Sequence, residues 1–166
     1  MKVKGSRSRD PLSLFKNRTP FVTYRAQQKP WLHLVLKIKR PIYESMLEQL
    51  QAAYPLEACG LLAGANDIAT RLYAIDNILQ SPTAYEMDPL QQVRALLEIE
   101  TLGQVLLAIY HSHPQGPQTP SATDVAQAYY PEAIYIIVSF ADPSEPAVRA
   151  FTIIDARVSE ISWMVV

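Results

Sequence analysis

Cysteine, glycine and long apolar runs are scarce in this 166-residue sequence, which has one cysteine and five glycines. The lone Cys59 excludes an intramolecular disulfide and favours a reducing compartment. No apolar run reaches the roughly 20 residues that a membrane span needs. No apolar segment follows the basic N-terminus, as it would in a secretory signal. These absences predict a cytoplasmic protein without a membrane partner.

The composition is otherwise that of a folded domain with an unusual division of charge. Apolar residues make up 49% of the chain, which at this length is enough for one hydrophobic core. Residues 1–40 carry eleven basic residues against Asp10, a net charge of +10, whereas residues 41–166 carry four basic and fifteen acidic residues, a net charge of −11. We therefore expect an acidic body with a basic extension.

The extension has no sustained apolar period, so we predict that residues 1–33 are disordered and that residues 34–166 form the folded domain. A transit peptide, an arm for nucleic acid or another anionic surface, and self-association with the acidic body are the functional alternatives. A plain solvated extension or a misassigned start stays open beside them. His33, at the border, is interpreted as structural.

The body alternates strand and helix patterns, which predicts an α/β domain with one mixed β-sheet flanked by helices. Short apolar or alternating runs predict strands at residues 34–38, 56–63, 68–75, 105–110, 133–140, 148–154 and 158–166. Helical periods predict helices at residues 41–53, 89–101 and 121–129. In the second helix, Val93, Leu96 and Leu97 are expected on the buried face.

The fourth predicted strand run leads directly into two histidines, in the sequence His111-Ser112-His113-Pro114, and we expect the strand to continue to Pro114. Residues i and i+2 of a strand project from one face, so both imidazoles can reach one ion while Ser112 points the other way. Pro114 cannot donate to a sheet ladder, which places the pair at the rim of the sheet. Asp124 follows at the start of a predicted helix, after a loop long enough to fold back over the strand.

A His, His, Asp set is typical of zinc, and three protein ligands leave a fourth position for water, as in catalytic zinc sites. We expect one Zn²⁺ per chain, held by His111, His113 and Asp124. Such chemistry needs a general base, and Glu57 is the candidate because it is a lone acid in an apolar segment. The hydroxyl of Ser121 is placed to stabilise an oxyanion.

Plainer interpretations of the same residues remain open. Ser121 and Asp124 have the spacing of a helix N-cap with a first-turn acid, and capping can coexist with ligation. Glu57 alone could be a partly exposed acid at a turn. Cys59 is interpreted as a small buried apolar residue, since no basic residue lies within ten positions to activate a thiolate.

This pattern resembles the signature of the JAMM (MPN-plus) metallopeptidases: an upstream Glu, His-x-His-Pro, a short loop and Ser-x-x-Asp. The flanking segments, listed here, are similar to the compact bacterial branch: residues 55–60, 85–89, 128–131 and 149–151. The resemblance covers about residues 34–166. It implies an MPN/JAB-like fold with cytidine-deaminase-like architecture, zinc held by His111, His113 and Asp124, Glu57 as general base and then acid, and Ser121 as oxyanion support.

The resemblance also implies a substrate class. Family members cleave peptide or isopeptide bonds next to ubiquitin-like tails, and bacterial relatives act on small sulfur-carrier proteins with Gly-Gly ends. The short loop at residues 115–120 argues against deubiquitination, so a sulfur-carrier protein or its conjugate is the expected substrate. The alternatives are a non-catalytic MPN scaffold and a RadC-like DNA-associated protein. The acidic body opposes binding to nucleic acid, and a homodimer stays open.

Overall fold

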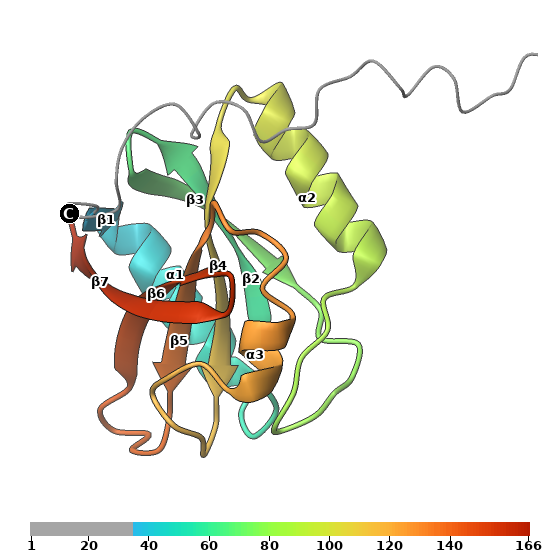
Figure 1. Cartoon of the computed structure of the whole chain (residues 1–166), viewed down its shortest axis with the longest axis vertical. Coiled ribbons are helices and arrows are strands. Elements are labelled where there is room, and N and C mark those ends of the chain that lie inside the picture. Colours follow the sequence, from blue (N-terminus) through green and yellow to red (C-terminus); the bar gives the residue numbers. More distant parts are fainter. Residues whose placement is uncertain (1–34) are drawn as a thin grey trace, which may run out of the picture. The chain divides into compact units, whose positions relative to one another are not determined.

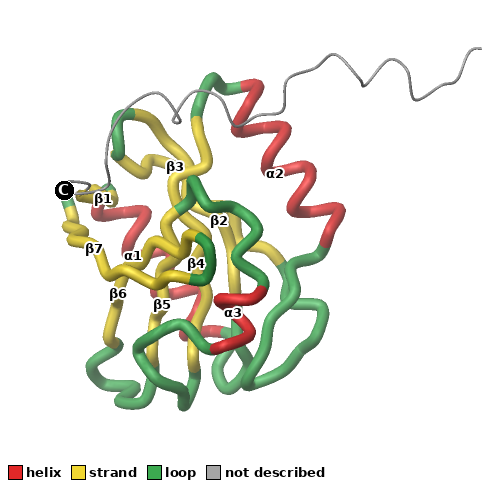
Figure 2. Tube along the Cα trace, viewed as in Figure 1, coloured by secondary structure: helices red, strands yellow, loops and turns green. Residues whose placement is uncertain are grey.

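The computed structural model describes residues 35–166, so the predicted extension and His33 lie outside the described residues. The described part contains seven strands and three helices (Figures 1 and 2). In chain order these are β1 (Val35–Ile38), α1 (Arg40–Ala52), β2 (Cys59–Ala65), β3 (Ile68–Ile75), α2 (Pro89–Thr101), β4 (Val105–His113), α3 (Ala122–Ala126), β5 (Ile134–Ser139), β6 (Ala147–Ile154) and β7 (Arg157–Val165).

The strands form one mixed sheet that closes into a barrel in the order β1-β3-β2-β4-β5-β6-β7. Most neighbours are antiparallel, but β4 runs parallel to β5, and β1 runs parallel to both β3 and β7. Closure depends on β1, which pairs with β7 over residues 35–38 and with β3 only at Lys37 and Ile38. The predicted mixed sheet is confirmed; its closure was not part of the prediction.

The central strand β4 is a nine-residue segment whose last seven residues are buried. Successive side chains of a strand point to opposite faces. Tyr110 accordingly packs in the core cluster that contains Met46 and Leu50 of α1, and Ile109 packs in the cluster that contains Ala95 and Ile99 of α2. The sheet is therefore covered by α1 on one face and by α2 on the other.

The predicted α2 spans the residues expected, but its buried face was predicted incorrectly. Val93 is 52% exposed and Leu97 is 55% exposed, whereas Ala95 and Ile99 are buried and Leu96 is half-buried. The helix carries apolar side chains on both sides, so an apolar count does not distinguish the inward face. Its start agrees with the sequence: Asp88 caps the helix by accepting from the Gln91 backbone N–H at 2.8 Å.

Several element ends differ from the prediction by one to three residues. The helix expected over residues 121–129 ends at Ala126, where the Ala128 N–H bonds to the Val125 carbonyl and the Tyr129 N–H to the Gln127 carbonyl instead of continuing the helical ladder. The strand expected from residue 56 begins at Cys59, because the Leu56 N–H bonds to the Ala53 carbonyl at the end of α1. Within residues 35–166, no helix has the length and apolar character needed to cross a membrane.

Candidate metal centre

The histidines lie at the C-terminal end of β4, on the α2 face of the sheet. His111 is fully buried and His113 is 4% exposed, with Ser112 between them on the opposite face, as the alternation of the strand predicts. The strand ends at His113, directly before Pro114. The expected placement of both imidazoles at the rim of the sheet is confirmed.

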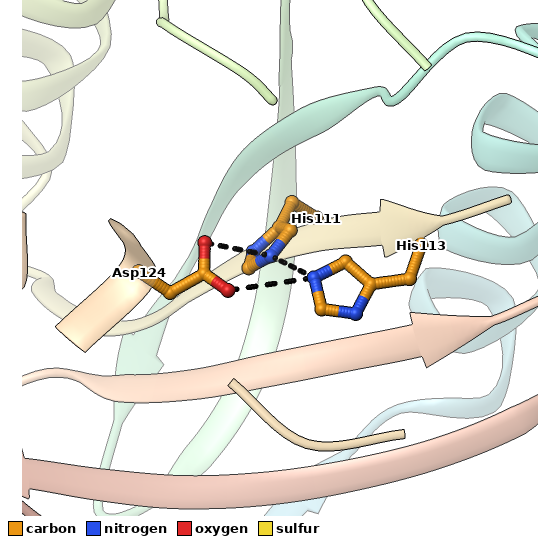
Figure 3. A group of neighbouring side chains, drawn as sticks. All are labelled: His111, His113 and Asp124. Atoms are coloured by element: carbon orange, nitrogen blue, oxygen red, sulfur yellow. Dashed lines mark hydrogen bonds and ion pairs between the residues drawn. The ribbon is translucent and has the colours of Figure 1, made fainter. Parts of the chain in front are cut away.

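Asp124 reaches the histidines from α3, and Figure 3 shows its carboxylate directed at both imidazoles. A capping box fixes this short helix: the Ser121 Oγ accepts from the Asp124 N–H at 3.1 Å, and the Asp124 Oδ2 accepts from the Ser121 N–H at 2.6 Å. The N-cap interpretation of these two residues is therefore confirmed. The Asp124 Oδ1 is free of this capping box and faces His111. Oδ2 takes part in the capping box and also faces His113.

The three side chains converge on one point. The two Nε2 atoms of His111 and His113 lie 3.0 Å apart, the His111 Nε2 lies 3.3 Å from the Asp124 Oδ1, and the His113 Nε2 lies 3.4 Å from the Asp124 Oδ2. Taking one ligand atom from each residue, the three atoms lie within 4.8 Å of one another, so they are close enough to share one metal ion.

Hydrogen bonding outside the triad orients one of the rings. The His113 Nδ1 lies 2.6 Å from the Pro117 carbonyl oxygen, which can only accept, so Nδ1 carries a proton and donates it. A second hydrogen bond of this kind commonly sets the tautomer of a metal-binding histidine. The His111 Nδ1 is buried and has no hydrogen-bond partner among the described residues.

The electrostatics of the triad favour a positive charge at its centre. Burial raises the pKa of a carboxyl group, but hydrogen bonds from His111 and His113 hold the pKa of Asp124 well below its usual range. Burial lowers the pKa of His113, but its bonds with Asp124 and the Pro117 carbonyl raise it above the ordinary value. For fully buried His111 desolvation prevails and lowers the pKa. Within residues 35–166, His111, His113 and Asp124 form a group of potential metal ligands close enough to hold one ion.

Glu57 lies two residues before β2 and is 5% exposed, so it is not the partly exposed turn acid of the plainer interpretation. Desolvation raises its pKa to about 7, with His113 opposing this shift and Asp124 reinforcing it. Glu57 therefore lies close enough to His113 and Asp124 for their charges to affect its pKa. The structure thus brings all five predicted site residues to the end of β4: Glu57, His111, His113, Ser121 and Asp124.

Cys59 is fully buried, as predicted. Burial raises the pKa of its thiol to about 12, with the charges of Glu57 and Asp76 adding to the effect. A thiol of this kind stays protonated at neutral pH and is a poor nucleophile.

Three residues that support the centre had no role in the prediction. Tyr85 stacks on His111 with ring centroids 4.4 Å apart. Ser112 and Asn77 form hydrogen bonds to the backbone around Glu57. Tyr85 carried a weak signal, since it lies in a segment similar to the bacterial branch. The other two had none, because their partners are more than 15 residues away in the sequence.

Comparisons with known proteins give a consistent result. Residues 39–154 match the family described as prokaryotic homologs of the JAB domain. The CysO-cysteine peptidase of Mycobacterium tuberculosis is 36% identical over 128 residues, which cover 76% of this chain and 88% of that protein. The probable TtuB-protein conjugate cleaving protease of Thermus thermophilus is 43% identical over 96 residues, 57% of this chain and 64% of that protein.

Solved structures share the fold. Protein DSY2949 from Desulfitobacterium hafniense superposes with a TM-score of 0.71 at 36% identity, over 78% of this chain and 92% of that chain. A structure described as JAMM, a metalloprotease-like zinc site in the proteasome and signalosome, has a TM-score of 0.53 at 21% identity, over 80% of this chain and 98% of that chain.

Proposed function

Since the chain belongs to the family of prokaryotic homologues of the JAB domain, we propose that it is a zinc-dependent hydrolase that cleaves peptide or isopeptide bonds at the C-terminal tail of a ubiquitin-like sulfur-carrier protein. Membership in this family and the α/β MPN fold agree with the resemblance drawn from the sequence. The observation that carries the proposal is the convergence of two imidazoles and a carboxylate beside a buried glutamate.

The donor set supports zinc as the cofactor. Two imidazole nitrogens and one carboxylate suit a borderline ion, and three protein ligands are typical of catalytic rather than structural zinc. His111, His113 and Asp124 would hold the ion. When bound, zinc would act as a Lewis acid and lower the pKa of a water molecule to about 7. The remaining chemistry belongs to side chains of the chain.

Glu57 is proposed as the general base and then the general acid. A group exchanges protons most effectively when its pKa is close to the working pH, and burial raises the pKa of Glu57 to about 7. It would take a proton from the attacking water and deliver it to the leaving amine. A lone buried carboxylate is costly to the fold, which supports a role in the reaction.

Ser121 is proposed to stabilise the oxyanion that forms on the scissile carbonyl. Its Oγ accepts a hydrogen bond from the Asp124 N–H, and the hydroxyl hydrogen is left to donate. Removal of a single oxyanion donor costs about 10²–10³ in kcat in well-studied hydrolases. The capping box holds the hydroxyl next to the proposed ligand Asp124.

The substrate class is supported by the relatives. The M. tuberculosis relative is named for a CysO–cysteine bond and the T. thermophilus relative for conjugates of TtuB with proteins. We extend this to the present chain as activity on a carrier protein joined through its C-terminus to cysteine or to a lysine side chain. The match with the first relative spans 88% of that protein, so most of its length is represented here.

The proposal is tested by mass spectrometry of the zinc-loaded full chain with two substrates, a carrier protein with a C-terminal cysteine adduct and a carrier linked to a protein lysine. We expect release of the intact carrier. Glu57→Gln should lower kcat by about 10²–10⁴, the usual contribution of a general base, with its zinc content unchanged. Glu44→Gln, at an exposed position of α1, is the matched control. The proposal is wrong if neither conjugate is cleaved or if Glu57→Gln is fully active.

A further inference from the structure

The backbone around Glu57 lies outside the regular sheet, yet it is completely hydrogen-bonded. The strand β2 begins at Cys59, which pairs with His111 of β4. Glu57 and Ala58 precede this last ladder pair, so the sheet alone does not determine their position. The four polar groups of their backbone, two N–H and two C=O, nevertheless each have a partner.

Ser112 provides both partners of Ala58. The Ser112 backbone N–H donates to the Ala58 carbonyl at 2.9 Å, and the Ala58 N–H donates to the Ser112 Oγ at 3.0 Å. Ser112 is fully buried and lies between the two histidines on β4. The residue next to Glu57 is therefore bound directly to the strand that carries two of the proposed metal ligands.

Asn77 provides one of the partners of Glu57. Its Nδ2 donates to the Glu57 carbonyl at 2.9 Å and to the Ala84 carbonyl at 3.1 Å, while its Oδ1 accepts from the N–H groups of Leu79 and Glu86 at 3.1 and 3.0 Å. These four hydrogen bonds use the full capacity of the amide. The Glu57 N–H in turn donates to the Ser81 carbonyl of the same loop at 2.9 Å.

The loop held by Asn77 also contacts the metal centre. It joins β3 to α2 (Figure 2) and is closed by the Asn77–Met87 bridge. Tyr85 projects from this loop onto the His111 ring. One amide thus connects the backbone of Glu57 with the ring that stacks on a proposed ligand.

We propose that Ser112 and Asn77 are positioning residues whose side chains hold the Glu57–Ala58 peptide and thereby fix the Glu57 carboxylate relative to His111, His113 and Asp124. This inference rests on the proposed function, because it concerns the geometry of that reaction. A displacement of about 1 Å can reduce turnover about 10²-fold while substrate and metal are still bound. Neither residue is itself one of the three proposed ligands, so the effect is expected on the position of the base.

The test compares Ser112→Ala, Asn77→Ala and Ser112→Thr with the wild-type full chain. We expect each alanine variant to lower kcat by about 10- to 100-fold, with KM and zinc affinity within about threefold of wild type. Ser112→Thr retains the hydroxyl and should restore most of the activity. Thr152→Val is the matched control, since it removes a buried hydroxyl on β6 that bonds to the Ser159 carbonyl of β7, and its kcat should equal that of wild type.

Two results would overturn the inference: kcat within twofold of wild type in both alanine variants, or a loss of kcat that follows a parallel loss of zinc. If Ser112→Thr does not fold, Asn77→Ala decides by the same criteria. Amide hydrogen exchange separates this inference from the proposed function. If the wild type cleaves no conjugate, the hydrogen bond from Ala58 to Ser112 can still be tested. Slow exchange of the Ala58 amide in wild type that becomes fast in Ser112→Ala supports the positioning role of Ser112. Fast exchange in wild type, or equally slow exchange in both proteins, rejects it.

Discussion

Burial of Glu57 lowers the stability of the folded protein when the carboxylate is charged, and the same burial suits the residue to its proposed role as general base. Its side chain is nearly inaccessible to water, and desolvation raises its pKa from 4.5 to about 7. Above pH 7 the folded protein must keep a buried negative charge that the unfolded chain exposes to water. The difference between the two pKa values makes this residue a source of pH-dependent instability.

We predict that Glu57→Gln stabilises the metal-free protein at pH 8. The carboxyl group is neutral in both states below pH 4.5, so no penalty exists there; the penalty develops as the pH rises from 4.5 to 7 and is complete above it. A difference of about 2.5 pKa units corresponds to about 3 kcal/mol at most. Urea unfolding of chelator-treated protein should give a gain of about 1–3 kcal/mol at pH 8.

The same comparison at pH 5 provides the internal check. The gain should be clearly smaller there, because the unfolded chain is then only partly ionised at this position. Glu44→Gln, an exposed acid on α1, should show no such dependence on pH. A gain of equal size at pH 5 and pH 8, or a loss at pH 8, would mean that Glu57 is not a destabilised carboxylate.

Residues whose roles depend on local spacing could be predicted, and those whose roles depend on distant partners could not. His111 and His113 share a strand face because of strand alternation, and Asp124 follows from the helix start. Asn77 and Ser112 act on residues 20 and 54 positions away. Nothing in their own neighbourhoods in the sequence indicates those contacts.

At the scale of elements, the order and type of strands and helices followed from periodicity, but faces and ends depended on tertiary contacts. The α2 helix is the clearest case, because apolar residues occur on both its sides. The end of α3 is another, since the chain beyond it is held by the Tyr135 hydroxyl of β5, which bonds to both the N–H and the carbonyl of Tyr130.

The inward face of α2 is tested by a pair of substitutions on this one helix. Ile99 is fully buried, so Ile99→Ala should lower the free energy of unfolding by about 2–5 kcal/mol. Leu97 is 55% exposed, so Leu97→Ala should change it by at most about 0.5 kcal/mol. Both variants introduce the same residue into the same helix. Equal effects in urea unfolding would contradict the face assigned to α2.

At the scale of the whole molecule, closure of the barrel is what the sequence did not indicate. A short β1 joins β7 and β3, and strand patterns alone carry no information on which distant strands meet. The two core clusters consist of residues from Leu36 to Ile153, one on each face of the sheet. The described part of the chain thus contains a complete core and a closed sheet.

We therefore predict that a chain starting at residue 34 folds and hydrolyses conjugates like the full chain. The expected result is a midpoint of thermal unfolding within a few degrees of the full chain and an unchanged kcat. Circular dichroism melting and the conjugate assay provide the measurements. An insoluble or inactive truncated chain would show that residues 1–33 contribute to the folded domain.

The proposed metal centre is best tested by the zinc content of freshly purified protein prepared without chelators. We expect about one zinc per chain in the wild type, about one in Glu57→Gln, and almost none in His113→Ala, because only the last removes a proposed ligand. Elemental analysis of the three proteins gives the answer. Wild-type protein without zinc, or His113→Ala that retains a full equivalent, would contradict the proposed centre.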